Sequence, residues 1–290
     1  MSQSVPPRCG FIGLGAMGAP MAGHLQRAGL LQLIGNRSQH KAEQWAREWH
    51  VQAASNAAQF ADCELVMLCV SLDQDVLDNV TALSTVLAPG AVVVDHSTVS
   101  QDTARAAAAR LAERGIGFVD APVSGGVEGA RNGKLSVMAG ADAAHLERAR
   151  PALQCYAARI SHMGEVGMGQ ATKAVNQVLV AGLNEAVCEG LAFAERLGLQ
   201  ADSLLPTLMA GAAANWFLDK RGASMLNNQF APGFKCAHMA KDLRIVQAMA
   251  AQAGIAHPTI DQALADYQQL EQSGLGDADT SALITLKRPS

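Results

Sequence analysis

The first half of the chain alternates short apolar runs with longer segments whose apolar residues recur at helical spacing. Six runs rich in Val, Leu, Ile and Met have the length of buried strands; they read RCGFIGL, LLQLIG, LVMLCV, AVVVD, GFVDAP and KLSVMAG. Between them lie helix-like segments such as SQDTARAAAARLAERG. Strands that alternate with helices in this way predict an α/β fold with a mostly parallel, doubly wound sheet.

After about residue 161 the strand-like runs stop and helical spacing takes over. The pattern predicts a long helix over 174–197, followed by helices that begin near Ser203, Asn215, Cys236 and Pro258. The glycine-rich stretch HMGEVGMG separates the two patterns. We therefore predict a doubly wound, Rossmann-like α/β domain over 1–162 and an all-helical domain over 163–290, joined by a long connecting helix.

Composition narrows the class of protein. The chain has 290 residues, of which 49% are hydrophobic and 17% charged, and a formal net charge of −4. These values are typical of a packed globular protein and give no indication of nucleic acid as a partner. The six cysteines contain no CxxC pair, so we expect free thiols and neither a metal site nor a disulfide framework. Without a signal-like or continuous membrane-length apolar run, the expectation is a cytoplasmic protein with no membrane partner.

The turn GLGAMG has GxGxxG spacing after the first predicted strand and before a predicted helix. Gly13 would permit the tight turn, Gly15 would let a diphosphate approach the backbone, and Gly18 would let the helix pack against the sheet. The free N–H groups at the start of that helix attract anions. The turn therefore predicts a dinucleotide site to which Leu14 and Met17 also contribute, although a glycine-rich packing turn has the same spacing.

The residues after the second strand indicate which dinucleotide binds. Sites for NAD usually carry a carboxylate here, which accepts hydrogen bonds from the ribose hydroxyls. This chain has Asn36, Arg37 and Ser38 instead, which we expect to contact the cofactor, with Lys41 one turn later. Arg37 can pair with a 2′-phosphate and Ser38 can donate to it, so the sequence favours NADP(H), with NAD(H) still possible. The alternative is that Arg37 is an ordinary solvated cation.

Two further loops follow strands and therefore face the expected ligand cleft. Ser124, Gly125 and Gly126 offer a hydroxyl and N–H groups that suit a carboxylate, but an ordinary β-turn explains them equally well. In the segment DHSTVS, Thr98 is a plausible cofactor contact. Ser100 is better explained as a helix cap, and we interpret His96 as structural.

A lone lysine, Lys173, heads the apolar segment of the long predicted helix. On a helix, Lys173, Asn176 and Gln177 share one face. If that face is buried, its polar groups need a partner such as a substrate carboxylate or carbonyl, and Lys173 could exchange a proton with the reacting oxygen. A lysine that simply reaches solvent fits the pattern equally well. By spacing alone, Lys241 and Asp242 are an ordinary surface pair.

Several motifs together resemble the β-hydroxyacid dehydrogenase family. They are GFIGLGAMGAPMAGHLQRAG, DAPVSGGVEGARNGKLSVMAGA, GMGQATKAVNQ and KDL, which occur in the family's order over roughly Gly10 to Val246. The segments LNEAV and APGFK resemble the tartronate semialdehyde reductase branch in particular. Two positions depart from the family pattern: His24 stands where Asn is frequent, and Ser71 where Pro is frequent.

The resemblance implies an NADP-binding Rossmann domain over 1–162, followed by a helical substrate and dimerisation domain over 163–290. It also implies a role for each matching position. Lys173 falls on the catalytic lysine, Asn176 on the substrate-binding asparagine, and Ser124 to Gly126 on the carboxylate loop. Thr98 falls beside the nicotinamide, Val70 and Ser71 on the loop under the cofactor. Lys241 falls on a lysine near cofactor and substrate, which replaces its interpretation as a surface residue.

The resemblance also implies hydride transfer between NADP(H) and a small carboxylate-bearing β-hydroxy acid or semialdehyde, without a metal, by a homodimer or homotetramer. An imine reductase and a non-catalytic dinucleotide-binding module remain alternatives. Lys173 weighs against the imine reductase, because such relatives commonly lack it, and Lys173, Asn176 and the serine–glycine–glycine loop weigh against the module.

Overall fold

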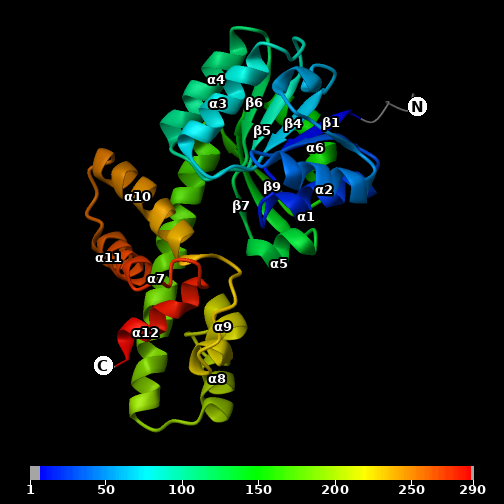
Figure 1. The fold of residues 1–290 in the computed structure, drawn as a ribbon. Helices are drawn as coiled ribbons and strands as arrows, with labels where there is room; N and C mark the ends of the chain where they lie inside the picture. The colour runs from blue at the N-terminus through cyan, green and yellow to red at the C-terminus, as the bar shows by residue number, and fades with distance from the viewer. Residues whose placement is uncertain (1–6, 289–290) are drawn as a thin grey trace. The chain divides into compact units, whose positions relative to one another are not determined.

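The chain divides into two compact units, Met1–Lys173 and Ala174–Ser290 (Figure 1). The computed structural model describes residues 7–288. Each unit has its own hydrophobic core. The division falls after residue 173 rather than after residue 162 as in the prediction from sequence, and the reason lies in the first turns of the long helix described below.

The first unit is built on a nine-stranded sheet in the order β3-β2-β1-β4-β5-β6-β8-β7, with β9 paired to β8. Strands β1 to β6 are parallel to one another, whereas β8 is antiparallel to β6 and β7 and parallel to β9. The strand bounds are β1 Cys9–Ile12, β2 Leu31–Gly35, β3 Gln52–Ala53, β4 Leu65–Leu68, β5 Val92–Asp95, β6 Gly117–Asp120, β7 Val123–Ser124, β8 Leu135–Ala141 and β9 Ala157–Gly164. The predicted fold class, a Rossmann sheet followed by helices, is confirmed.

Both faces of the sheet are covered, which explains why its central strands are continuous apolar runs. In β4, Leu65 and Met67 pack in the core with α1, α2 and α6, while Val66 and Leu68 pack in the core with α3 and α4. The helices are α1 Gly18–Arg27, α2 Gln39–Trp49, α3 Asp73–Ser84, α4 Gln101–Ala112, α5 Gly126–Arg131 and α6 Ala143–Leu153, with a 3-10 turn η1 Ala57–Phe60.

Three strands are not among the six predicted runs. β3 and β7 have two residues each, too few to show a period. β9 carries Arg159, Ser161 and His162 and is largely exposed, so it lacks the apolar run by which buried strands are recognised.

The second unit is helical. It contains most of α7 Met168–Arg196, then α8 Ala201–Met209, α9 Trp216–Leu226, α10 Cys236–Gln252, α11 Pro258–Gln272, a 3-10 turn η2 Thr280–Leu283 and α12 Ile284–Lys287. Asn215 caps α9 through its side chain, and α10 and α11 begin at the predicted Cys236 and Pro258.

Helix α7 begins at Met168, before the predicted residue 174. Its early glycine is the reason: a Cβ on Gly169 would lie 2.4 Å from the carbonyl oxygen of Met138. Gly169 therefore serves close packing against β8 and does not interrupt the helix.

Among the described residues, α7 is also the one helix long and apolar enough to cross a membrane by length and composition. Core helices of soluble proteins pass the same test, and Ala181, Cys188 and Leu191 of α7 are buried in the core of the second unit.

Candidate functional site

The glycine turn after β1 has a shape that larger residues would not allow. Gly13 has a φ of +101°, and a Cβ there would lie 2.2 Å from the carbonyl oxygen of Cys69. A Cβ on Gly18 would lie 1.8 Å from the carbonyl oxygen of Gly13. These two glycines therefore let the turn close against the β4 loop and let α1 start directly above it.

The middle glycine faces open space, because nothing lies within 4 Å of a Cβ built on Gly15. Within the described chain, α1 has no side-chain cap and no acidic residue in its first turn, so its N–H groups favour an anion. Leu14 is buried and Met17 packs against the core of this face. The turn thus fits the diphosphate of a dinucleotide.

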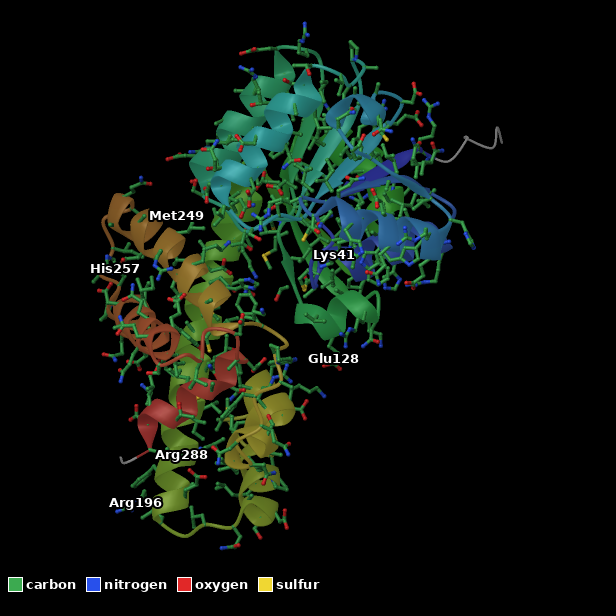
Figure 2. The ribbon with its side chains drawn as sticks, viewed as in Figure 1. Lys41, Glu128, Arg196, Met249, His257 and Arg288 are labelled. Carbon is green, nitrogen blue, oxygen red and sulfur yellow. The ribbon has the colours of Figure 1, made fainter. Side chains whose placement is uncertain are left out.

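Of the residues after β2, one is hydrogen-bonded within the protein and the others are exposed to solvent. Asn36 is used internally: its Oδ1 accepts a hydrogen bond from the N–H of Leu14 at 2.9 Å, and its Nδ2 donates to the carbonyl oxygen of Ser38 at 3.2 Å. Arg37 and Ser38 are exposed, and the Ser38 hydroxyl does not cap α2. Lys41 is exposed in the first turn of that helix, which has no acidic residue there (Figure 2). The edge of the turn is therefore cationic.

The loops after β4 and β5 are tied to each other. The backbone N–H of Val70 donates to the hydroxyl of Ser97 at 2.9 Å. Ser71 is exposed and Thr98 is half-buried. His96 is buried between the carbonyl oxygen of Ala121 and the hydroxyl of Tyr156. Burial lowers the pKa of its imidazole to about 4, so His96 is a neutral structural residue at pH 7.

The start of α7 is held by a carboxylate that the sequence reasoning did not single out. Asp120, at the end of β6, accepts hydrogen bonds from the N–H of Gly167 at 2.7 Å and of Gln170 at 2.9 Å. Burial raises the pKa of Asp120 to about 6, against the opposing effect of these hydrogen bonds. The signal in the sequence is slight, since an aspartate at the end of a strand is common.

Gln170 makes a second attachment of α7 to the sheet. Its side chain accepts from the N–H of Val99 at 3.2 Å and donates to the carbonyl oxygen of Ser97 at 2.8 Å. Together with Asp120 it fixes the first turn of α7 relative to the ends of β5 and β6.

This attachment brings Lys173 to the predicted carboxylate loop. Lys173 is only 8% exposed, and its Nζ donates to the carbonyl oxygen of Val123 at 3.0 Å. The next residues are Ser124, at the end of β7, and Gly125 and Gly126, whose φ angles are +125° and +61°. A buried ammonium thus lies beside a loop whose hydroxyl and backbone N–H groups suit an anion.

The other polar residues of the α7 face belong to the second unit. Asn176 Nδ2 donates to Gln177 Oε1 at 2.9 Å, and Gln177 Nε2 donates to Asp242 Oδ2 at 2.8 Å. Lys241 Nζ lies 2.9 Å from Asp242 Oδ1. Asp242, a second residue that the sequence reasoning left aside, is 2% exposed.

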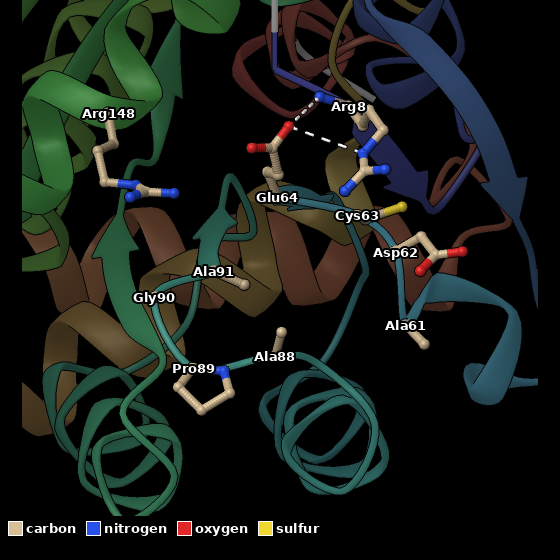
Figure 3. A pocket seen from close by; sticks show the side chains of 10 residues that line it. All are labelled: Arg8, Ala61, Asp62, Cys63, Glu64, Ala88, Pro89, Gly90, Ala91 and Arg148. Atoms are coloured by element: carbon tan, nitrogen blue, oxygen red, sulfur yellow. Dashed lines mark hydrogen bonds and ion pairs between the residues drawn. The ribbon is translucent and has the colours of Figure 1, made fainter.

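A cavity of about 230 Å³ lies at the amino ends of the strands, opposite the glycine turn (Figure 3). Its lining includes Arg8, Glu64 and Ala91, which precede β1, β4 and β5. Ligands of doubly wound sheets bind at the carboxyl ends of the strands, where the glycine turn and the loops after β4, β5 and β6 lie, so this cavity is not the candidate site. The described residues contain no group of three or more His, Cys, Asp or Glu side chains placed to hold a metal ion.

Comparison with known proteins matches both parts of the chain. Residues 8–164 match the NAD binding domain of 6-phosphogluconate dehydrogenase, and residues 167–287 match the NAD-binding domain of NADP-dependent 3-hydroxyisobutyrate dehydrogenase. These matches, with the open glycine turn, identify a nicotinamide dinucleotide as the cofactor.

Individual relatives are similar over nearly their full length. An uncharacterized oxidoreductase of Shewanella frigidimarina is 38% identical, over 94% of this chain and 96% of that protein. The 2-hydroxy-3-oxopropionate reductase of Escherichia coli is 33% identical, over 96% of each. The solved structure of Mycobacterium tuberculosis 3-hydroxyisobutyrate dehydrogenase with L-serine superposes with a TM-score of 0.89 at 32% identity, over 98% of this chain and 100% of that one.

Proposed function

The chain belongs to the β-hydroxyacid dehydrogenase family, and on that premise we propose that it transfers a hydride between NADP(H) and a small β-hydroxy acid or its semialdehyde. The observation that carries this proposal is the 3.0 Å contact of Lys173 Nζ with the carbonyl oxygen of Val123, directly before Ser124. It sets a proton-carrying group next to a loop suited to a carboxylate.

In the oxidative direction, the substrate carboxylate binds the Ser124 hydroxyl and the N–H groups of Gly125 and Gly126. Neutral Lys173 accepts the proton of the substrate hydroxyl, while the C–H bond breaks and its hydrogen leaves with the electron pair. The bound nicotinamide supplies the hydride acceptor. In the reductive direction, the Lys173 ammonium donates the proton to the carbonyl oxygen. Burial of Lys173 keeps water away from this exchange.

The proposed preference for NADP(H) rests on the cationic edge of the glycine turn. Arg37 and Lys41 are exposed next to the end of β2, and an arginine can make two parallel hydrogen bonds with a phosphate. The carboxylate that would repel a 2′-phosphate is missing between Asn36 and Lys41. The remaining proposed cofactor contacts are made by Val70, Ser71, Thr98 and Lys241.

An exposed apolar stripe supports a homodimer or homotetramer. Val175, Leu179, Leu183 and Phe193 lie along α7 and are 61%, 62%, 45% and 64% exposed. Their spacings of four, four and ten residues set them on one face of the helix. Contiguous apolar surface of this kind is typical of an interface. None of the six cysteines, all of which lie within residues 7–288, is in a disulfide. Because reducing compartments keep cysteines in this state, this supports the proposed cytoplasmic location.

Substitution of Lys173 tests the proposed chemistry. Lys173→Ala removes the proton carrier, and Lys173→Arg keeps a cation that does not release its proton. We expect both to lower kcat by a factor on the order of 10² to 10⁴. The absorbance of the reduced nicotinamide follows the reaction, with NADP(H) and NAD(H), on 3-hydroxyisobutyrate, glycerate, serine, and the glyoxylate and semialdehyde substrates of the family.

Lys220→Ala, which removes an exposed lysine of α9, is the matched control and should keep wild-type turnover. Full activity in Lys173→Ala would contradict the role of the lysine. If the wild-type protein turns over none of these compounds with either cofactor, the proposed function itself is wrong.

A further inference from the structure

Asn176 and Gln177 of α7 and Asp242 of α10 form a chain of hydrogen-bonded side chains, called the polar relay below. The carboxylate of Asp242 fixes the direction in which hydrogen bonds are donated along it. A carboxylate has only acceptors, so Asp242 can receive only the NH₂ end of the Gln177 amide. Gln177 Nε2 accordingly donates to Asp242 Oδ2 at 2.8 Å. Asp242 cannot turn away, because its other oxygen lies 2.9 Å from Lys241 Nζ, and both Asp242 and Gln177 are 2% exposed.

The orientation of the Gln177 amide in turn fixes that of the Asn176 amide. With its NH₂ end on Asp242, Gln177 turns its oxygen toward Asn176, and Asn176 Nδ2 donates to that oxygen at 2.9 Å. Asn176 Oδ1 is thereby kept out of the relay. Among residues 7–288, no N–H or O–H group donates to Asn176 Oδ1, and the residue is only half-buried. An acceptor in this position is available for a hydrogen-bond donor on a ligand.

The reacting hydroxyl does not supply that donor. It has one proton, and in the proposed reaction that proton goes to Lys173, three residues before Asn176 on the same face of α7. A second donor is required, and in a three-carbon β-hydroxy acid it sits on the carbon between the carboxylate and the reacting carbon.

We infer that Asp242, through Gln177, holds Asn176 with its oxygen toward the substrate and so selects β-hydroxy acids that carry a hydroxyl or an ammonium on carbon 2. This inference rests on the proposed function. Asp242 is a positioning residue, because it acts through Gln177, while Asn176 contacts the substrate. Substrates with only hydrogen or methyl on carbon 2 leave the Asn176 oxygen without a partner and are disfavoured.

Three acids that share the reacting hydroxyl and the carboxylate separate the possibilities. Glycerate has a hydroxyl on carbon 2, L-serine an ammonium, and 3-hydroxypropionate only hydrogen. We expect the wild-type kcat/KM to be roughly tenfold or more higher for glycerate or L-serine than for 3-hydroxypropionate. Whichever of the two is preferred identifies the donor.

Asp242→Asn should reverse the relay. Lys241 can only donate, so it holds the new amide by its oxygen and leaves the NH₂ end for Gln177. Gln177 then turns its own NH₂ end to Asn176 and occupies the acceptor. The preference should fall, mainly through KM, and further for L-serine than for glycerate, because an ammonium cannot accept a hydrogen bond and a hydroxyl can.

Asn176→Leu removes the acceptor and should abolish the preference for both compounds, and it keeps the test available if Asp242→Asn does not fold. Asp261→Asn is the matched control, since Asp261 also accepts from a glutamine, Gln247 at 2.6 Å, but is exposed on α11. It should keep the wild-type preference.

Two results would overturn the inference without touching the proposed function. One is wild-type turnover of 3-hydroxypropionate at least as efficient as that of the other two acids, with dependence on Lys173. The other is an unchanged preference in Asn176→Leu accompanied by weaker NADPH binding, measured by its fluorescence, which would assign the donor to the cofactor carboxamide. If the wild-type protein turns over none of these acids and none of the semialdehydes with either cofactor, the proposed function is wrong instead.

Discussion

At the residue scale, the turn after β2 separates two neighbours that look equivalent in the sequence. Asn36 and Arg37 were both expected to contact the cofactor. The Asn36 amide is bound to Leu14 and Ser38 within the protein, whereas Arg37 is exposed beside Lys41. The proposed selectivity for the 2′-phosphate is therefore expected to depend on Arg37.

Replacement of Arg37 by Ala should weaken the binding of NADP(H) more than the binding of NAD(H). The lost charge-assisted pair corresponds to roughly a 10- to 100-fold rise in KM for NADP, with little change for NAD, which lacks the phosphate. Steady-state kinetics with each cofactor measure the effect. Arg47→Ala, an exposed arginine later on α2, is the control. Equal losses for both cofactors would contradict this role for Arg37.

At the element scale, the position of α7 depends on a buried carboxylate at the end of β6. The N–H groups of Gly167 and Gln170 meet at Asp120, and Lys173 follows within one turn. The pKa of Asp120 is raised to about 6 from its usual 3.8. Between these values the folded protein binds the proton and the unfolded chain does not, so the contribution of Asp120 to stability falls as pH rises through this range.

Comparison with Asp120→Asn isolates this contribution from other titrating groups, including His96, whose lowered pKa acts in the opposite direction. The free energy of unfolding of wild type, minus that of the variant, should be about 1 kcal/mol larger at pH 5 than at pH 7.5. Urea unfolding at the two pH values measures it. A difference independent of pH would show that Asp120 does not titrate in this range.

At the scale of the whole molecule, the exposed stripe on α7 is the feature that an isolated chain leaves unexplained. Phe193, in the last turn of α7, is 64% exposed. A charge introduced there should prevent burial against a second copy. We expect the wild-type protein to be a dimer or tetramer and Phe193→Glu to shift it toward the monomer.

Size-exclusion chromatography with light scattering measures the molar mass of the wild-type assembly and of the Phe193→Glu variant. Ile255→Glu places the same charge at another exposed apolar residue, 59% exposed and outside α7, and should leave the assembly intact. A monomeric wild-type protein would contradict the proposed assembly.

The sequence by itself determined the fold class and the parts of the site that are made by local backbone. Alternating apolar runs and helical spacing indicate the sheet and the helices, because each element is recognised by its own period. The glycine turn is likewise set by local backbone: Gly13 has a positive φ, and a Cβ on Gly18 would meet the carbonyl oxygen of Gly13. An exposed edge strand such as β9 gives no such signal.

Only the tertiary structure decided which polar residues meet. Lys173 and Val123, Asp120 and Gly167, and Gln177 and Asp242 are 50, 47 and 65 residues apart, and no local pattern relates one partner to the other. The same holds for the start of α7, where Gly169 reads as a turn until its approach to Met138 is known. Spacing identifies which side chains share an element, whereas burial and the pairing of donors with acceptors are set by the packing of elements from distant parts of the chain.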